Sequence, residues 1–210
     1  MKKSALEQLR ENERQNRANH ILNAAKTVFI KKGYQNATVR DIASKAELTT
    51  GAIYAYFKNK DTMYGEICKQ VFLDLTRHLE AASNDKSGTM LDRLRRLYIA
   101  YITYHEENAD NTSLLEINYQ NLKIDKTLSK ELTYLLNRIM TLSTLIITDG
   151  IKNGDLPETV NSDEYALTLW GTVEGILYLN YYGTIDHFKF KVKNIVNNFL
   201  DSFVGNSNKV

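Results

Sequence analysis

The sequence has few of the residues that break helices or cross-link chains. Its 210 residues include one proline, Pro157, one cysteine, Cys68, and ten glycines. A lone cysteine cannot form an intrachain disulfide, and we expect Cys68 to be a buried bystander rather than a redox thiol. No window approaches the roughly 18 consecutive apolar residues of a membrane span. The N-terminus is too polar for a secretory signal, so the sequence predicts a cytoplasmic protein without membrane contact.

Apolar residues recur every three or four positions through most of the chain, which is the spacing of amphipathic helices. Strand-like alternation is hard to find, and the 43% hydrophobic and 25% charged residues are typical of a soluble globular protein. The spacing therefore predicts an all-α fold of about nine helices. The polar stretch 1–18 either extends the first helix or is disordered. The later helices are expected near Gly88–Asn108, Thr112–Asn121, Lys126–Asn153, Ser162–Tyr182 and Ile185–Val204.

The small net charge of +2 conceals an asymmetry along the chain. Residues 1–60 hold 12 Lys and Arg against 5 Asp and Glu, a net charge of +7, whereas residues 61–210 hold 15 against 20, a net charge of −5. A basic first third suggests that this part of the protein meets a polyanion. A basic face that serves only solubility is the alternative.

The basic third is expected to begin with two helices. The first has an apolar stripe from Ile21 to Phe29 and is expected to end at Gly33, a typical C-terminal cap. The second begins at Thr38, because Thr38 and Asp41 fit a variant of the Ser/Thr-x-x-acid capping box.

A short break separates the second helix from a third, expected at about Thr50–Phe57. Asn59 can cap a fourth helix that runs from near Lys60 to about Ala82. Two short helices joined by a tight turn, at about residues 38–57, are the parts of a helix-turn-helix.

The third helix has an unusual outward surface. At about 100° per residue, Ile53 and Phe57 define its buried direction, and Tyr54 and Tyr56 fall about 80° to either side. A solvated helix would carry Lys and Glu outward, whereas a crest of small residues between two tyrosines suits a helix inserted into the major groove. The tyrosines could instead be half-buried packing residues. The crest consists of Gly51, Ala52 and Ala55, and Thr49 and Thr50 lie at the end that reaches base edges first.

Three further residues could meet DNA phosphates or bases. Lys60, in the first turn of a helix, opposes the helix dipole unless an anion binds there too. Thr38 could offer its hydroxyl to a phosphate, and Arg40 could reach a guanine or the backbone. The alternative for Lys60 is a solvated side chain without a partner.

Residues 21–64 resemble the N-terminal domain of TetR-family transcriptional regulators. The matching elements are Ala24-Ala25, Phe29, Gly33-Tyr34, Thr38-Val39-Arg40-Asp41-Ile42-Ala43, Ala46, Leu48, Gly51, Ile53-Tyr54, Tyr56-Phe57 and Lys60. The resemblance covers about a fifth of the chain and is specific over that stretch. It implies a DNA-binding domain at 15–64, with the helix-turn-helix at about 38–57. It also implies a larger helical domain at 65–210 that binds a ligand and dimerises.

The resemblance also assigns the DNA-contacting positions. They are Thr38, Arg40, Thr49, Thr50, Gly51, Ala52, Tyr54, Tyr56 and Lys60. Ala55 departs from the family, because some members carry a larger base-contacting side chain at that position. We expect Ala55 to read little beyond a thymine methyl, so specificity should depend on Arg40, Thr49, Thr50, DNA shape and dimer spacing.

The second domain has candidate residues for an effector site and for a dimer interface. Aromatic walls with polar tips suit a small, mostly apolar ligand, with plain core packing as the alternative. The candidate lining residues are Tyr98, Tyr101, Tyr119, Trp170 and Tyr178. His105 has no partner at metal-ligand spacing, so no metal site, cofactor or catalytic residue is predicted. The last two helices are the expected dimer interface, through Gly171, Gly175, Val192, Ile195, Phe199 and Phe203.

These features favour a homodimeric repressor that binds a near-palindromic operator in double-stranded DNA and is released by a small-molecule effector. The first alternative is a regulator of the same fold that has no ligand, or one that activates. An enzyme using the aromatic cavity is a remote alternative, because the sequence offers no nucleophile–base pair, phosphate loop or metal spacing. A helical scaffold that binds only proteins would leave the basic third unexplained.

Overall fold

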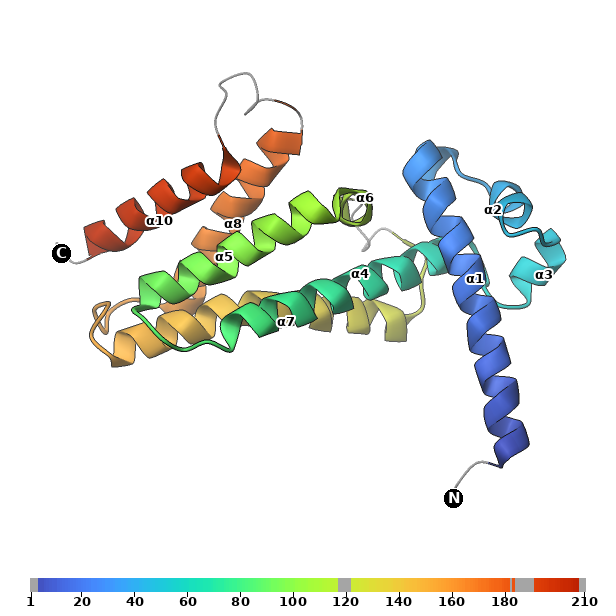
Figure 1. The fold of residues 1–210 in the computed structure, drawn as a ribbon, viewed down its shortest axis with the longest axis horizontal. Helices are drawn as coiled ribbons and strands as arrows, with labels where there is room; N and C mark the ends of the chain where they lie inside the picture. The colour runs from blue at the N-terminus through green and yellow to red at the C-terminus, as the bar shows by residue number, and fades with distance from the viewer. Residues whose placement is uncertain (1–3, 117–121, 182, 184–190, 208–210) are drawn as a thin grey trace. The chain divides into compact units, whose positions relative to one another are not determined.

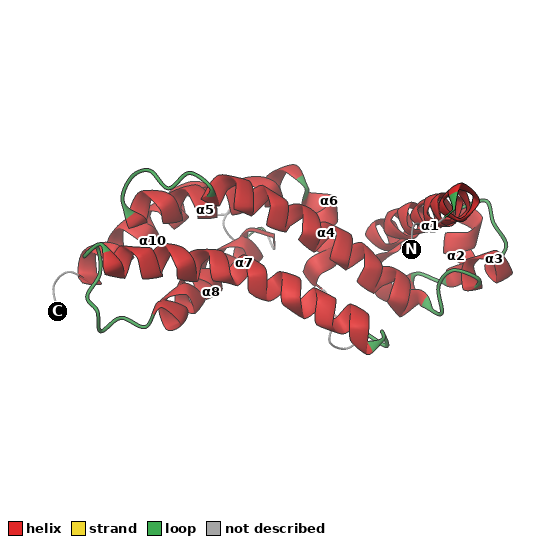
Figure 2. Cartoon of the chain, turned by 90° about the horizontal axis from the view of Figure 1, so that it is seen from below, coloured by secondary structure: helices red, strands yellow, loops and turns green. Residues whose placement is uncertain are grey.

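The computed structural model describes residues 4–116, 122–181, 183 and 191–207. Within these ranges the chain forms nine α-helices, one 3-10 helix and no strand, which confirms the predicted all-α class (Figure 1, Figure 2). The chain packs as two compact units, Met1–Val71 with Asp110–Leu132 and Phe72–Ala109 with Thr133–Val210. The domain boundary expected at residue 64 stays a prediction.

The first unit is built around the long helix α1 (Ala5–Asn36), beside which α2 (Val39–Lys45) and α3 (Thr50–Tyr54) lie (Figure 1). Ser4 caps α1, since its hydroxyl accepts the Glu7 N–H while the Glu7 carboxylate accepts the Ser4 N–H. The polar stretch left open by the sequence is therefore helical from Ala5 onward. This adds several turns ahead of the apolar stripe.

Gly33 interrupts α1 where the sequence predicts its end. Its φ of 74° lies in the left-handed region, which favours glycine. One further turn follows to Asn36, and the Ala37 N–H then closes the helix on the Gly33 carbonyl, 3.2 Å away. The predicted stop is therefore correct for the regular helix and three residues early for the last turn.

The core of the first unit combines the apolar stripe of α1 with aromatic rings. Ile21 and Phe29 are almost fully buried, and Phe29 packs edge-on against Tyr64 at 5.0 Å between ring centroids. Tyr64 lies on α4 (Lys60–Ser83), one turn before Cys68. Cys68 is buried as expected, and burial raises the pKa of its thiol to about 12, which makes it unreactive.

The second unit contains α5 (Met90–Glu107), α8 (Ser162–Tyr181) and α10 (Val192–Ser207), with α10 packed against both α5 and α8. The C-terminal part of α7 (Lys126–Lys152) belongs to the same unit. Its fully buried side chains include Leu79, Leu94, Leu97, Ile147, Val173 and Leu200. No helix in the described parts of the chain is both long and apolar enough to cross a membrane.

One predicted helix differs from the structure. The described part of the helix expected at Thr112–Asn121 forms the end of the short α6 (Ala109–Thr112) and a 3-10 turn, η1 (Ser113–Glu116). The Ser113 hydroxyl donates to the Asp110 carbonyl at 2.9 Å, an example of a short polar side chain competing with the helix for a backbone group. The last described helix is α10, which begins at Val192; the predicted start at Ile185 lies outside the described residues, as do residues 117–121.

Candidate nucleic-acid interface

The second helix of the predicted motif begins at a complete capping box. The Thr38 hydroxyl accepts the Asp41 N–H at 3.1 Å, and the Asp41 carboxylate accepts the Thr38 N–H at 3.0 Å. The hydroxyl also donates to that carboxylate, so its only donor is already engaged before any phosphate arrives. Hydrogen bonds from Lys32 and Thr38 lower the pKa of Asp41 to about 2, which keeps the cap ionised at neutral pH.

The turn between α2 and α3 closes through Glu47, which has a φ of 55°. The Leu48 N–H donates to the Ala43 carbonyl at 2.9 Å and the Glu47 N–H to the Ser44 carbonyl at 3.3 Å, which is the Schellman pattern of a helix end. Glu47 occupies the left-handed position at which glycine is common. This tight end places the start of α3 directly after α2.

The faces of α3 agree with the angular argument from the sequence. Ile53 is fully buried and Phe57, just beyond the helix, is 7% exposed, so both point into the unit as predicted. Tyr54 is 55% exposed and Tyr56 half-buried. Thr49 caps the helix by accepting the Ala52 N–H at 3.1 Å. The outward crest contains Gly51 and Ala55, which are exposed, and Ala52, which is half-buried.

Most of the expected DNA contacts therefore lie on exposed positions of α2 and α3. Thr38, Arg40, Thr49 and Thr50 are all exposed, on the first turn of α2 or at the start of α3. A Cβ atom added at Gly51 would meet only the Thr49 hydroxyl, at 3.8 Å, so space above the crest is open. The geometry is that of a small-faced helix able to approach a surface closely.

Lys60 does not have the surroundings that the sequence suggested, which were an anion bound at the N-terminus of its helix. Its ammonium donates to the carbonyls of Tyr34 at 2.8 Å and Ala37 at 3.0 Å, and lies 4.3 Å from the centroid of the Tyr34 ring. These carbonyls form the negative end of α1, which explains how a lysine is tolerated in the first turn of α4. An ammonium has three donors, so at most one remains for a phosphate, and that contact stays a prediction.

A hydrogen-bonded cluster beside Lys60 has no clear signal in the sequence pattern. Asp61 accepts the Tyr34 hydroxyl proton and, at 2.7 Å, the Lys123 N–H. Burial opposes ionisation of Asp61, but these hydrogen bonds outweigh it and lower the pKa of the carboxyl. Asn59 caps α4 as predicted, accepting the Thr62 N–H at 2.7 Å. The cluster ties the start of α4 to the end of α1 and to residue 123.

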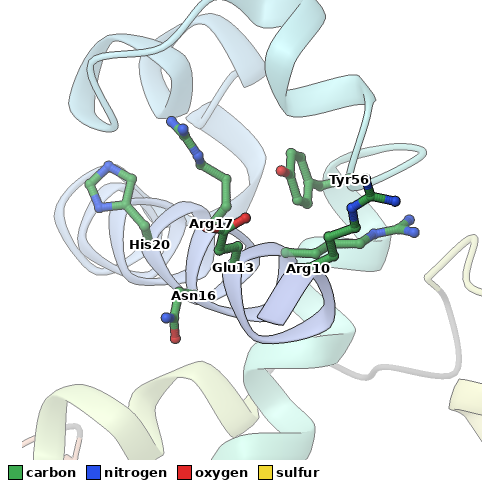
Figure 3. A pocket seen from close by; sticks show the side chains of 7 residues that line it. Arg10, Glu13, Asn16, Arg17, His20 and Tyr56 are labelled. Atoms are coloured by element: carbon green, nitrogen blue, oxygen red, sulfur yellow. The ribbon is translucent and has the colours of Figure 1, made fainter. Parts of the chain in front are cut away.

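A groove of about 820 Å³ lies between the N-terminal turns of α1 and Tyr56 (Figure 3). Three arginines and one glutamate provide its charged walls: Arg10, Arg14, Arg17 and Glu13. Asn16 and His20 complete it, and His20 Nε2 lies 2.9 Å from the Ala46 carbonyl at the end of α2. The sequence did not reveal this groove, because the spacing of polar residues alone does not show that residues 5–18 are helical.

Three of the five expected effector-site residues lie together in the second unit. Tyr98, Tyr101 and Trp170 are buried, with ring centroids 5.2 Å apart for Tyr98 and Trp170 and 4.6 Å for Tyr101 and Trp170. Tyr178 is separate from this buried cluster, at 62% exposed, and Tyr119 lies outside the described residues. Among the described side chains, no group of His, Cys, Asp and Glu is arranged to hold a metal ion.

The residues expected at a dimer interface differ in how exposed they are. Gly171 and Gly175 are exposed, and a Cβ atom added at either would meet nothing within 4 Å. Ile195 and Phe199 are half-buried, whereas Val192 is 7% exposed and packs inside its own protomer. The side chain of Phe203 lies outside the described residues. The dimer interface itself stays a prediction, and Val192 is the least exposed of its described residues.

Known proteins resemble this chain over the segment that contains the helix-turn-helix. Residues 21–67 match the family profile of the bacterial regulatory proteins, tetR family. Over these residues the chain is similar to the DNA-binding domain of the TetR family. This family and the relatives described below are transcriptional regulators rather than enzymes.

The individual relatives of this chain include a repressor. The chain is 30% identical over 83 residues to the HTH-type transcriptional repressor DhaR of Mycobacterium sp. (strain GP1), a match to 40% of this chain and 42% of DhaR. It is 25% identical over 156 residues to the fatty acid metabolism regulator protein of Bacillus subtilis (strain 168), covering 73% of this chain and 78% of that one.

A solved structure supports the same fold over nearly the whole chain. The transcriptional regulator FadR from Bacillus subtilis, in complex with stearoyl-CoA, superposes with a TM-score of 0.69 at 20% identity. The match covers 88% of this chain and 96% of that one. At this identity the likeness establishes the fold alone.

Proposed function

We propose that this TetR-family regulator acts in the cytoplasm as a homodimeric repressor whose α3 enters the major groove of a near-palindromic operator. The observation that carries the proposal is the outward crest formed by Gly51, Ala52 and Ala55, which Tyr54 and Tyr56 flank. A small-faced helix approaches base edges closely, and the flanking tyrosine hydroxyls can reach phosphates on both groove walls. Two such helices in a dimer would enter successive major grooves, roughly 34–36 Å apart.

Within this proposal the DNA contacts have two roles. Thr49, Thr50 and Arg40 are exposed and long enough to contact base edges or the adjacent backbone, so they contribute to sequence choice. Tyr54 and Tyr56 position the helix through phosphates. Thr38 acts by capping α2, since its hydroxyl proton is already donated to Asp41. Gly51 and Ala52 allow the close approach, and Lys60 acts mainly by fixing α4 to α1, with at most one N–H left for DNA.

The DNA-binding proposal is tested by selection from a random-sequence duplex library with the full-length protein, followed by gel shift of the selected duplex. We expect a sequence-dependent complex that weakens steeply with salt. The variants Tyr54→Phe and Tyr56→Phe, which lose only hydroxyl groups, should weaken binding to all sequences alike. Selection of no sequence, or binding that ignores sequence, contradicts the proposal.

The effector part of the proposal rests on polar atoms that lack partners in the buried aromatic cluster. Trp170 Nε1 and His105 Nε2 are buried without a hydrogen-bond partner among the described residues. The ring centroids of His105 and Tyr101 lie 4.5 Å apart, and Tyr101 packs edge-on against Trp170. Buried polar groups are normally satisfied, so two such atoms beside one apolar cluster suit an amphipathic ligand with a polar end.

The first probe is stearoyl-CoA, because the FadR structure from Bacillus subtilis is a complex with this ligand. A ligand at 100 times its dissociation constant stabilises the protein by about 2.7 kcal/mol, a rise in Tm of roughly 5–11 °C for a chain of this size. Trp170→Phe should reduce that rise, and the ligand should release the selected duplex. A Tm shift without DNA release favours the alternative, a regulator whose ligand activates; no shift with any acyl-CoA removes this ligand class.

The dimer is tested at the two open glycines of α8. Gly171→Trp fills no space inside the protomer, so we expect unchanged helicity and a monomer in sedimentation velocity. If Gly171→Trp remains dimeric with unchanged affinity, the interface lies elsewhere. A monomeric wild-type protein would contradict the dimer itself.

A further inference from the structure

The N-terminal extension of α1 places a row of arginines beside the helix-turn-helix. Arg10, Arg14 and Arg17 are spaced four and three residues apart, which puts them within about 60° of one another around the helix. All three are exposed, and all three line the groove whose opposite wall includes Tyr56. Figure 3 shows Arg10 and Arg17 on the Tyr56 side of α1, with Asn16 pointing the other way.

The positive charge of this row is not neutralised by the described part of the protein. None of the three guanidinium groups forms an ion pair with a described acidic side chain. Glu13 is the only acidic residue among those that line the groove, so the three arginines leave it with a net charge of +2. Glu7 is engaged in the helix cap. A groove with this surplus is suited to an anion with several charges.

The length of the row matches a nucleic-acid backbone. Arg10 and Arg17 are seven residues apart, about 10 Å along a helix that rises about 1.5 Å per residue. Phosphates of one DNA strand recur every 3.4 Å of duplex axis, and they lie farther apart than this because the strand also winds around the axis. A row of about 10 Å therefore spans about two of them, and the long arginine side chains extend its reach to a third. Guanidinium groups bind phosphate oxygens in pairs, which suits one arginine per phosphate.

Tyr56 connects this row to the surface proposed to read DNA. It lies two residues after Tyr54, on the other side of the buried direction set by Ile53 and Phe57. His20 reinforces the arrangement, because its ring nitrogen 2.9 Å from the Ala46 carbonyl joins α1 to the end of α2. The extension is thus held on the Tyr56 side of α3 rather than left free.

We propose that Arg10, Arg14 and Arg17 bind consecutive phosphates of the DNA strand that flanks the segment entered by α3, with Tyr56 contacting the nearest of them. The inference rests on the proposed DNA binding and adds a second, sequence-independent contact surface to it. It predicts a longer footprint than the helix-turn-helix alone would give. An anionic membrane surface is the competing occupant, and the test includes it.

The test uses the full-length protein and the selected duplex with about 10 flanking base pairs on each side, a length equal to one helical turn. The variant Arg10→Gln/Arg14→Gln removes two charges per protomer, and Lys130→Gln/Lys152→Gln, at two exposed lysines of α7, removes the same number away from the groove. Fluorescence anisotropy at several salt concentrations gives the slope of log affinity against log salt. Ethylation interference gives the contacted phosphates.

Each phosphate contact contributes about 0.9 to that slope, so the arginine variant of a dimer should lower it by about 3 to 4, while the lysine control leaves it unchanged. Interference at the flanking phosphates should disappear, and base preference should remain. An equal slope for wild type and the arginine variant overturns the inference while leaving the proposed function standing. The inference is also overturned if the arginine variant loses binding to phosphatidylserine vesicles while its binding to DNA stays intact. Failure of the wild type to select any duplex refutes the proposed function instead.

Discussion

Substituting Lys60 by Met tests whether the contact between α4 and the end of α1 stabilises the first unit. Methionine keeps an unbranched apolar stem and removes the ammonium, so the carbonyls of Tyr34 and Ala37 lose donors at 2.8 and 3.0 Å. Hydrogen bonds from a charged donor are worth about 1.5–3 kcal/mol each, and the cation–π contact about 0.5–1 kcal/mol. Water can replace part of this at a half-exposed site, so we expect a loss of about 2–3 kcal/mol.

That loss should appear as a decrease in Tm of roughly 4–12 °C and a lower urea midpoint, followed by far-ultraviolet circular dichroism. The control is Lys58→Met, a neighbouring exposed lysine, which should change the stability by less than about 0.5 kcal/mol. Equal stabilities for the two variants would refute the reasoning, because the carbonyl contacts would then contribute nothing. The salt slope of DNA binding by Lys60→Met at low temperature separately tells whether the third N–H meets a phosphate.

Three further perturbations test other parts of the structure. Because Lys32 and the helix cap lower the pKa of Asp41 to about 2, its contribution to stability is present above about pH 4 and lost toward pH 2; thermal melts of Asp41→Asn should therefore vary less with pH than wild type in that range. Burial lowers the pKa of His105 to about 4, so stability should fall as pH decreases from about 6.5 to 4, and an unchanged pH profile for His105→Gln would contradict this. Gly150→Ala should cost about 1–3 kcal/mol in urea unfolding, since the new Cβ would lie 2.7 Å from Met90 Cγ, and Gly150→Ala with Met90→Ala should recover part of the loss.

Local signals in the sequence predicted much of the site. The Thr38–Asp41 capping box, the Asn59 cap and the buried direction of α3 through Ile53 all follow from short-range spacing, and the structure confirms them. Each depends on residues within about one turn, where helix geometry determines which side chains meet. The fold class was predictable for the same reason, since helical periodicity is a local property.

Contacts between distant segments were not predictable in the same way. The position of Lys60 depends on the carbonyls of Tyr34 and Ala37, more than twenty residues earlier, and no spacing rule brings them together. Tyr178 shares a helix with Trp170, yet it is 62% exposed while Trp170 is buried, because α8 packs on only one face. The arginine groove required knowledge that α1 begins at Ala5.

The central claim, that the crest of α3 enters a DNA groove, is tested most directly by placing a leucine on the crest. Gly51→Leu has open space in the free protein, where a Cβ would contact only the Thr49 hydroxyl at 3.8 Å, and it removes an unfavourable glycine from a helix. We therefore expect a Tm equal to or above that of the wild type. Fluorescence anisotropy with the selected duplex should show binding weakened by roughly 100-fold or more, about 2.7 kcal/mol. Wild-type affinity and sequence preference in a folded Gly51→Leu protein would contradict the account.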